Sequence, residues 1–247
     1  MKTFATYNIK GGVGKTSTAV NLAYLAARDG QRTLLWDLDP QGAATYLFRI
    51  RPRVKGGGKA LVQGRRPLED AIKGTDYDGL DLLPADFTYR NMDLALDAAK
   101  KPTRRIARLL APLAADYDVV FLDCPPSMSL VSENVLEAAN TLLVPLIPTT
   151  LSLRTFDQLT HFVASLDGRR PALLGFFSMV DRRKRLHREI VERLPSERSD
   201  IATTAIPALS VVEQMAVRRA PLATFAPRSP ACERYEHLWA QAQQLTP

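Results

Sequence analysis

The sequence has few cysteines and no long apolar run. Cys124 and Cys232 are the only two cysteines in 247 residues, and their separation gives no metal-ligand spacing. We therefore expect two unpaired, reduced thiols with structural roles. No apolar run approaches the roughly 20 residues that a membrane-spanning helix needs, and residues 1–9 are too short and too mixed for a signal peptide. These features predict a soluble, cytoplasmic protein.

Composition and length favour an ordinary globular domain. Hydrophobic residues make up 46% of the chain and charged residues 24%. Length alone permits two domains, but parallel α/β sheets often exceed roughly 200 residues without splitting. We therefore interpret residues 1–247 as one domain. The net charge of +7 is compatible with a polyanionic partner but does not identify one.

Short apolar runs alternate with helical patterns along most of the chain. The predicted strands are residues 4–8, 33–37, 81–84, 119–123, 142–147, 173–180 and 202–206. The predicted helices are residues 16–28, 103–114, 130–139, 153–166, 184–194 and 231–243. Ser152 is the expected N-cap of the helix over 153–166. This alternation predicts a doubly wound, mostly parallel sheet flanked by helices, with ligands at the carboxyl ends of the strands.

Two segments interrupt the alternation of strands and helices. Residues 51–66 are basic and contain three consecutive glycines, a composition that predicts a mobile loop. Residues 221–230 are rich in proline, and we expect them to be irregular.

The strongest motif is Lys-Gly-Gly-Val-Gly-Lys-Thr at residues 10–16, between the first predicted strand and the first helix. Glycines allow the backbone amides to surround a phosphate, and the helix N-terminus adds positive charge. Lys15 is expected to reach the β- and γ-phosphates, and the Thr16 hydroxyl to ligate Mg²⁺. The candidate nucleotide-binding residues here are Gly11, Gly12, Val13, Gly14, Lys15, Thr16 and Ser17.

The loop departs from the general phosphate-loop pattern in one informative way. Ile9 stands where a glycine is usual, and a second lysine, Lys10, leads the loop. This pattern resembles the deviant Walker A motif of the ParA/MinD group of ATPases. The resemblance implies that ATP and Mg²⁺ are the cofactors. It also implies that Lys10 reaches the nucleotide of the partner subunit in an ATP sandwich dimer.

Two further acidic motifs resemble the switches of the same family. Residues 37–42 read Asp-Leu-Asp-Pro-Gln-Gly, close to the first switch; the alternative is a polar strand end followed by a turn. The resemblance implies that Asp39 positions the attacking water and that Asp37 supports the magnesium shell. Residues 119–123 form a hydrophobic strand that ends in Asp123, the Walker B arrangement, whose carboxylate holds Mg²⁺ opposite Thr16. Cys124 is interpreted as a packing residue.

The resemblance weakens toward the C-terminus. Pro207 fits the family loop that lies against the adenine, but the arginine, asparagine and glycine of that loop are missing from the residues that follow. The adenine contacts and the partner therefore stay open.

Basic clusters are the candidate DNA-binding surfaces. The candidate residues are Arg182, Arg183, Lys184, Arg185, Arg188, Arg218 and Arg219. A solvated helix start is the alternative reading of the first five. No helix-turn-helix, zinc-finger or aromatic stacking motif accompanies them, so we expect sequence-independent contacts with phosphates.

The resemblance is greatest to small, Soj-like ParA proteins without an N-terminal DNA-reading domain, because the chain opens directly on its first strand. It implies an ATP-dependent homodimer that binds non-specific nucleoid DNA. A ParB-like protein or cargo adaptor would stimulate its hydrolysis, and the cargo would be a plasmid, a chromosome origin or a protein assembly. A MinD-like membrane switch is the main alternative, but after Arg234 the chain contains no Lys or Arg to attract anionic lipid. A P-loop ligase or an iron-protein relative is a third alternative. The cysteine pattern disfavours the iron-protein relatives, and no dedicated substrate pocket for a ligase can be located in the sequence.

Overall fold

The computed structural model describes residues 1–99, 101–166 and 169–245. Within these ranges eight strands form one sheet in the order β3-β4-β2-β5-β1-β6-β7-β8. The strands are β1 (Lys2–Thr6), β2 (Thr33–Asp37), β3 (Lys73–Gly74), β4 (Leu80–Leu83), β5 (Val119–Asp123), β6 (Thr141–Leu146), β7 (Ala172–Val180) and β8 (Ile201–Pro207). All pairings are parallel except that of β3 with β4. The predicted doubly wound, mostly parallel sheet is confirmed.

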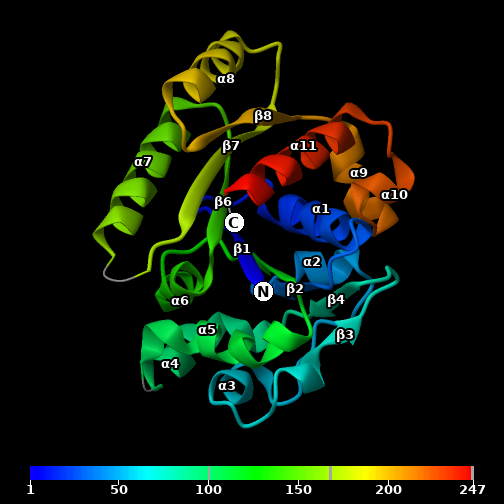
Figure 1. Ribbon diagram of the computed structural model, residues 1–247, viewed down its shortest axis with the longest axis vertical. Helices are drawn as coiled ribbons and strands as arrows, with labels where there is room; N and C mark the ends of the chain where they lie inside the picture. The colour runs from blue at the N-terminus through cyan, green and yellow to red at the C-terminus, as the bar shows by residue number, and fades with distance from the viewer. Residues whose placement is uncertain (100, 167–168, 246–247) are drawn as a thin grey trace.

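Helices cover both faces of the sheet (Figure 1). One face carries α3 (Gly57–Val62), α4 (Met92–Asp97), α5 (Arg105–Leu110), α6 (Leu130–Ala138), α7 (Thr150–Ser165) and α8 (Arg185–Glu197). The other carries α1 (Lys15–Arg28), α2 (Ala43–Leu47), α9 (Ser210–Arg218), α10 (Leu222–Phe225) and α11 (Pro230–Gln244). The central strands are buried on both faces, which is why they read as continuous apolar runs.

Aromatic packing fixes the C-terminal helix against the sheet. The ring of Trp239 on α11 lies edge-on to Phe4 of β1, with centroids 5.4 Å apart, and 5.6 Å from Phe121 of β5. Its indole N–H donates to Asp29 at 3.1 Å. Helix α11 therefore packs beside α1, the helix that follows the glycine loop, as Figure 1 shows.

Three local predictions were wrong. Residues 51–66 contain α3, because Leu61 and Val62 are buried in the core and Gly58 packs against Tyr89. The proline-rich segment 221–230 contains the short helix α10. The N-cap of α7 is Thr149 rather than Ser152: the Thr149 hydroxyl accepts from the amide of Ser152, so the helix begins three residues earlier than predicted.

Candidate functional site: a phosphate loop, paired carboxylates and a base pocket

The glycine loop joins the carboxyl end of β1 to α1. Gly12 and Gly14 have φ angles of 68° and 94°, the left-handed region in which a side chain is strained. A Cβ atom on Gly14 would also lie 2.9 Å from the hydroxyl of Ser178. Glycine at position 14 is therefore required both by the backbone conformation and by the neighbouring strand.

Lys15 lies at the centre of the loop. Its side chain is buried, and its ammonium donates to the carbonyl oxygen of Lys10 at 2.9 Å. Burial lowers the pKa of Lys15, while the nearby carboxylate of Asp123 raises it. The amide of Lys10 donates to the side chain of Asn8 at 2.9 Å, which fixes the start of the loop. The charged group is thus held where a phosphate would meet the backbone amides.

Two carboxylates lie beside each other at the carboxyl ends of two neighbouring strands. Asp37 ends β2 and pairs in register with Asp123, which ends β5. The Thr6 hydroxyl donates to Oδ1 of Asp123 at 3.3 Å, whereas Oδ2 of Asp123 is buried without a hydrogen-bond partner in the described ranges. Burial and the charge of Asp37 raise the pKa of Asp123, and the nearby Thr16 hydroxyl lowers it.

Asp37 organises the segment that follows β2. Its Oδ2 accepts from the amide and the hydroxyl of Thr45 at 2.8 and 2.7 Å, and its Oδ1 accepts from the amide of Asp39 at 3.2 Å. Burial raises the pKa of Asp37 to about 6, while the bonds from Thr45 lower it. Asp39 itself is half-buried, lines the pocket described below and accepts from the amide of Gln41 at 2.9 Å.

The residues fit a magnesium ion that the nucleotide helps to hold. The carboxylate of Asp123 lies near the Thr16 hydroxyl, and both are oxygen ligands of the type that hard cations prefer. One oxygen of this carboxylate has no hydrogen-bond partner in the described residues. No group of three or more acidic, histidine or cysteine side chains in the described residues could hold a metal by itself. Phosphate oxygens and water would therefore complete the coordination shell, as is usual for Mg²⁺.

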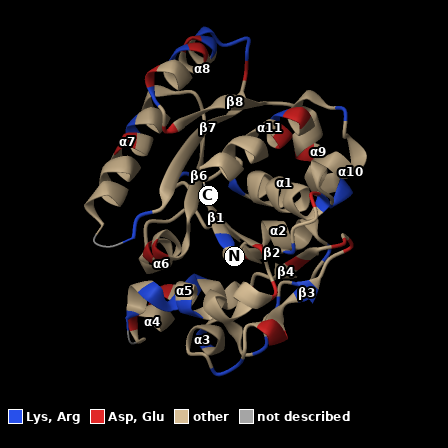
Figure 2. Cartoon of the chain, viewed as in Figure 1, with Lys and Arg blue, Asp and Glu red and all other residues tan. Residues whose placement is uncertain are grey.

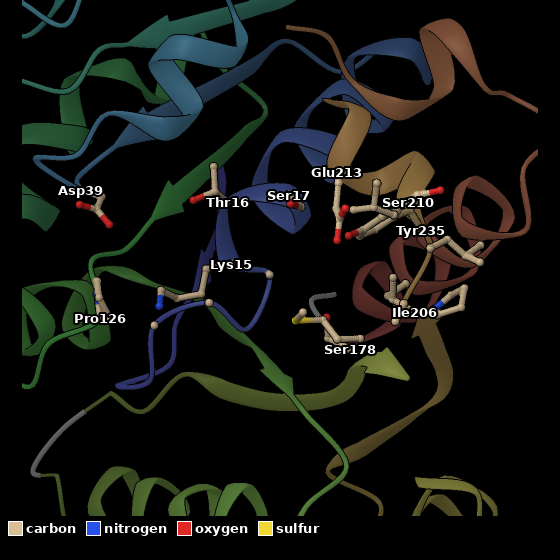
Figure 3. A pocket seen from close by; sticks show the side chains of 18 residues that line it. Lys15, Thr16, Ser17, Asp39, Pro126, Ser178, Ile206, Ser210, Glu213 and Tyr235 are labelled. Atoms are coloured by element: carbon tan, nitrogen blue, oxygen red, sulfur yellow. The ribbon is translucent and has the colours of Figure 1, made fainter. Parts of the chain in front are cut away.

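A pocket of about 470 Å³ lies beside the loop. The predicted site residues that line it are Gly11, Gly12, Gly14, Lys15, Thr16, Ser17, Asp39 and Pro207. Lys10, Val13, Asp37 and Asp123 do not line it, and the last three of these are buried. Figure 3 shows Asp39 and Lys15 at one end and Glu213, Ser210 and Tyr235 at the other.

Most residues at the far end of the pocket belong to no motif in the sequence. Its additional lining residues are Ser178, Met179, Ile206, Ala208, Leu209, Ser210, Val212, Glu213 and Tyr235. Met179 has a φ of 54°, a strained conformation for a residue with a side chain. Burial raises the pKa of the Tyr235 hydroxyl to about 12. The spacing of Val212 and Met215 in the sequence is that of a helix rather than the expected loop, and this signal could have located the far end of the pocket.

The predicted basic residues lie on two separate elements. Arg183 pairs with Asp181, Arg185 with Glu189, and the Arg188 guanidinium donates to the carbonyl of Arg182 at 2.7 Å. The side chains of Arg182 and Lys184 make no hydrogen bond or close ion pair in the described part of the chain. Arg218 and Arg219 end α9, and the Arg219 guanidinium lies 4.4 Å from the ring centroid of Tyr46. Figure 2 shows α8 and α9 well apart.

Both thiols are buried and free, as predicted. Burial raises the pKa of Cys124 well above its usual value, so this residue is a poor nucleophile next to Asp123. Within the described residues, no helix has the length and apolar character needed to cross a bilayer.

The glycine loop leads into a helix through Lys15 and Thr16, and carboxylates stand at two adjacent strand ends. Together these features define a P-loop nucleotide hydrolase. A family model described as an AAA domain matches residues 1–173. The chromosome partitioning protein ParA of Myxococcus xanthus is 35% identical over 192 residues, which cover 76% of this chain and 68% of that protein. The sporulation initiation inhibitor protein Soj of Bacillus subtilis is 30% identical over 240 residues, 95% of each chain. The chain belongs to the ParA family of small partitioning ATPases.

A solved structure extends the likeness to the bound cofactors. Cobyrinic acid a,c-diamide synthase from Mycobacterium smegmatis, with a bound ATP analog and magnesium, aligns with a TM-score of 0.84 at 25% identity. The alignment covers 99% of this chain and 94% of that one. ATP and Mg²⁺ are the cofactors of the present ATPase, which converts ATP to ADP and phosphate as a partitioning or positioning ATPase.

Proposed function

We propose that two ATP-bound copies of the chain form a dimer across their nucleotides and bind DNA without sequence preference. A ParB-like protein or cargo adaptor then stimulates hydrolysis, the dimer separates, and the chain leaves the nucleoid. Cargo attached to the partner follows the receding ATPase. The proposal makes the protein a cytoplasmic, nucleoid-associated switch.

The observation that carries the DNA proposal is the pair of unpaired cations at the turn before α8. In the described part of the chain, Arg182 and Lys184 make no ion pair within contact distance, while the arginines beside them do. Asp181 also fixes the conformation of this turn, because its carboxylate accepts a hydrogen bond from the amide of Arg183 at 3.0 Å. A turn that is internally fixed and presents free cations suits phosphates of a duplex.

The geometry of the nucleotide site supports a role for each of its residues. Lys15 and the loop amides would bind the β- and γ-phosphates, and Thr16 with Asp123 would hold Mg²⁺. When bound, the metal neutralises charge on the phosphates. Asp39 has one carboxylate oxygen available on the pocket wall, from which it would orient the attacking water. Asp37 supports this arrangement by holding the Asp39 amide and Thr45 in place.

The direct test is binding of the chain to a non-specific duplex with ATP, with ADP and without nucleotide, at two salt concentrations. We expect binding only with ATP. If each subunit contacts about three phosphates, six contacts lose roughly a thousandfold in affinity between about 50 and 200 mM salt. Binding that is independent of nucleotide, or unchanged over this salt range, would exclude the DNA-coating switch while leaving the ATPase in place.

A further inference from the structure

Two arginines join the ends of α2 and α9, helices that cover the same face of the sheet (Figure 1). The guanidinium of Arg219, at the end of α9, donates to the carbonyl oxygen of Tyr46 on α2 at 2.9 Å. The guanidinium of Arg49, just after α2, donates to the carbonyl oxygen of Arg218 on α9 at 3.2 Å. Each arginine therefore bonds the last turn of the other helix, and we call this reciprocal pair of bonds the arginine clasp.

The backbone of both clasp arginines has a conformation that glycine adopts more easily. Arg49 has a φ of 61° and Arg219 a φ of 52°, and in the described ranges only Lys101 and Met179 are further non-glycine residues with a positive φ. Glycine is the usual residue where a helix ends in this conformation, because it has no Cβ atom to strain. The presence of arginine at both helix ends is therefore explained by the side chain rather than by the backbone.

The electrostatics of this contact favour cations. The C-terminus of a helix carries partial negative charge on its unpaired carbonyl groups, and two such ends meet here. The Arg219 guanidinium also lies over the ring of Tyr46, and Arg49 pairs with Asp76 at 3.2 Å. Both guanidinium groups are thus engaged within the chain, although Arg219 was predicted from the sequence to contact DNA.

Helix α2 carries the bonds that fix the segment containing Asp39. Thr45, which precedes Tyr46, donates to the carboxylate of Asp37 through its amide and its hydroxyl. The same carboxylate accepts from the amide of Asp39 at 3.2 Å. A continuous series of contacts therefore leads from the clasp to Asp39.

Of the two helices, α9 has the stronger attachment outside the clasp. Its Met215 is buried, and the sulfur of Met215 accepts from the side chain of Asn21 on α1 at 3.3 Å. Helix α2 has only five residues, and a helix of this length is not stable without tertiary contacts. Loss of the clasp would therefore release α2 and leave the pocket wall formed by α9 in place.

We propose that Arg49 and Arg219 are positioning residues for ATP hydrolysis: by joining α2 to α9, they hold Asp39 where it orients the attacking water. The proposal rests on the proposed role of Asp39 and does not involve DNA. Loss of the clasp should lower kcat, because a displacement of about 1 Å at a reacting group can cost about 100-fold in rate. The KM for ATP should not change, because neither arginine lines the nucleotide pocket.

The test measures basal ATP hydrolysis by the full chain in the absence of DNA. Arg49→Gly and Arg219→Gly permit the left-handed backbone and remove the clasp, and Arg219→Asn, which also tolerates this conformation, is a second variant. Arg228→Ala, which removes an exposed arginine outside the clasp, is the control and should behave as wild type. Each clasp variant is expected to lose about tenfold in kcat with KM unchanged. Arg49→Gly/Arg219→Gly should lose no more than either single variant, because either change opens the clasp.

The outcomes separate the clasp from the other roles of these residues. A lower kcat with unchanged KM in the single variants, and no further loss in the double variant, supports the proposal. The proposal is overturned if kcat stays at or above that of wild type, if KM rises as kcat falls, or if the two losses multiply. Normal basal hydrolysis with weaker binding to a duplex overturns it too, and assigns Arg219 to DNA.

Asp39→Ala, measured in parallel, identifies the cause of a failure. Normal hydrolysis in Asp39→Ala would mean that the proposed role of Asp39 is wrong, and the clasp proposal fails with it. Slow hydrolysis in Asp39→Ala with normal hydrolysis in the clasp variants would mean that Asp39 keeps its role and that α2 is positioned without the clasp.

Discussion

The ammonium of Lys15 is held inside the glycine loop by the carbonyl of Lys10 at 2.9 Å. Lys15→Ala keeps the backbone amides but removes the charged group that meets the β- and γ-phosphates. Since charged hydrogen bonds contribute roughly 1.5–3 kcal/mol each, we expect ATP affinity to fall by about 100-fold in calorimetry. Lys59→Ala, which removes an exposed lysine of α3, is the control and should bind ATP as wild type does. Unchanged affinity in Lys15→Ala would remove this lysine from the site.

Asp39 differs from Asp37 in the availability of its oxygens. Both oxygens of Asp37 accept hydrogen bonds from the following segment, while Asp39 lines the pocket and gives one oxygen to Gln41. Asp39→Ala should therefore reduce ATP hydrolysis by about 100-fold or more, the size of a general-base contribution, with ATP affinity nearly unchanged. Phosphate release measures the first quantity and calorimetry the second. Normal hydrolysis would show that Asp39 does not position the water.

At the scale of elements, Asn21 joins α1, the helix after the glycine loop, to the far end of the pocket lined by Ser210, Glu213 and Tyr235, which we call the base wall. It is buried on α1; its amide nitrogen donates to the sulfur of Met215 on α9 at 3.3 Å, and its oxygen accepts from the amide of Leu222 on α10 at 2.8 Å. It also interacts with the hydroxyl of Tyr235, which lines the pocket. One side chain thus connects three C-terminal helices with the helix that follows the phosphate loop.

Asn21→Leu should loosen the base wall while leaving the phosphate loop intact. Leaving the buried amide of Leu222 without a partner costs about 1–3 kcal/mol, which urea denaturation would report as a lower free energy of unfolding. We expect weaker binding of ATP but unchanged binding of tripolyphosphate, which needs only the loop. Equal losses for both ligands would mean that Asn21 acts on the whole fold rather than on the base wall.

The elements that the sequence predicted are those with strong local signals. The buried strands ending in Asp37 and Asp123 are continuous apolar runs, and the glycine loop has a specific spacing. The two-residue strand β3 carries no such signal, because its exposed Lys73 and Gly74 pair only through the backbone. Helix α3 was hidden because three glycines dominate its start, although Leu61 and Val62 bury its other end.

The site was predictable where a residue acts through its type and unpredictable where it acts through placement. Lys15 and Thr16, placed directly after the glycines of the loop, indicate binding of phosphate and of a metal from the sequence alone. Ser178 and Tyr235 reach the same pocket from β7 and α11, and only the packing of those elements brings them there. The family resemblance also suggested a loop after Pro207, whereas the chain forms α9.

At the scale of the whole molecule, Lys10 is the residue through which two copies would meet. Its ammonium has no partner within the described ranges, and it does not line the pocket of its own chain, although its backbone fixes the loop. A cation with no use in its own site suits the phosphates of a second subunit, where it would neutralise charge only when two ATP-bound chains face each other.

Lys10→Ala should therefore bind ATP like wild type but remain monomeric. Sedimentation of the Asp39→Ala chain with ATP, in which hydrolysis is slowed, should give a dimer, and the Asp39→Ala/Lys10→Ala chain a monomer at the same concentration. Asp39→Ala/Lys59→Ala tests whether any lysine loss has this effect and should stay dimeric. The Lys10→Ala chain should also lose ATP-dependent binding to a duplex. The reason is that a single subunit makes too few phosphate contacts for stable binding to DNA. A dimer that persists without Lys10 would mean that contacts outside the nucleotide join the two chains.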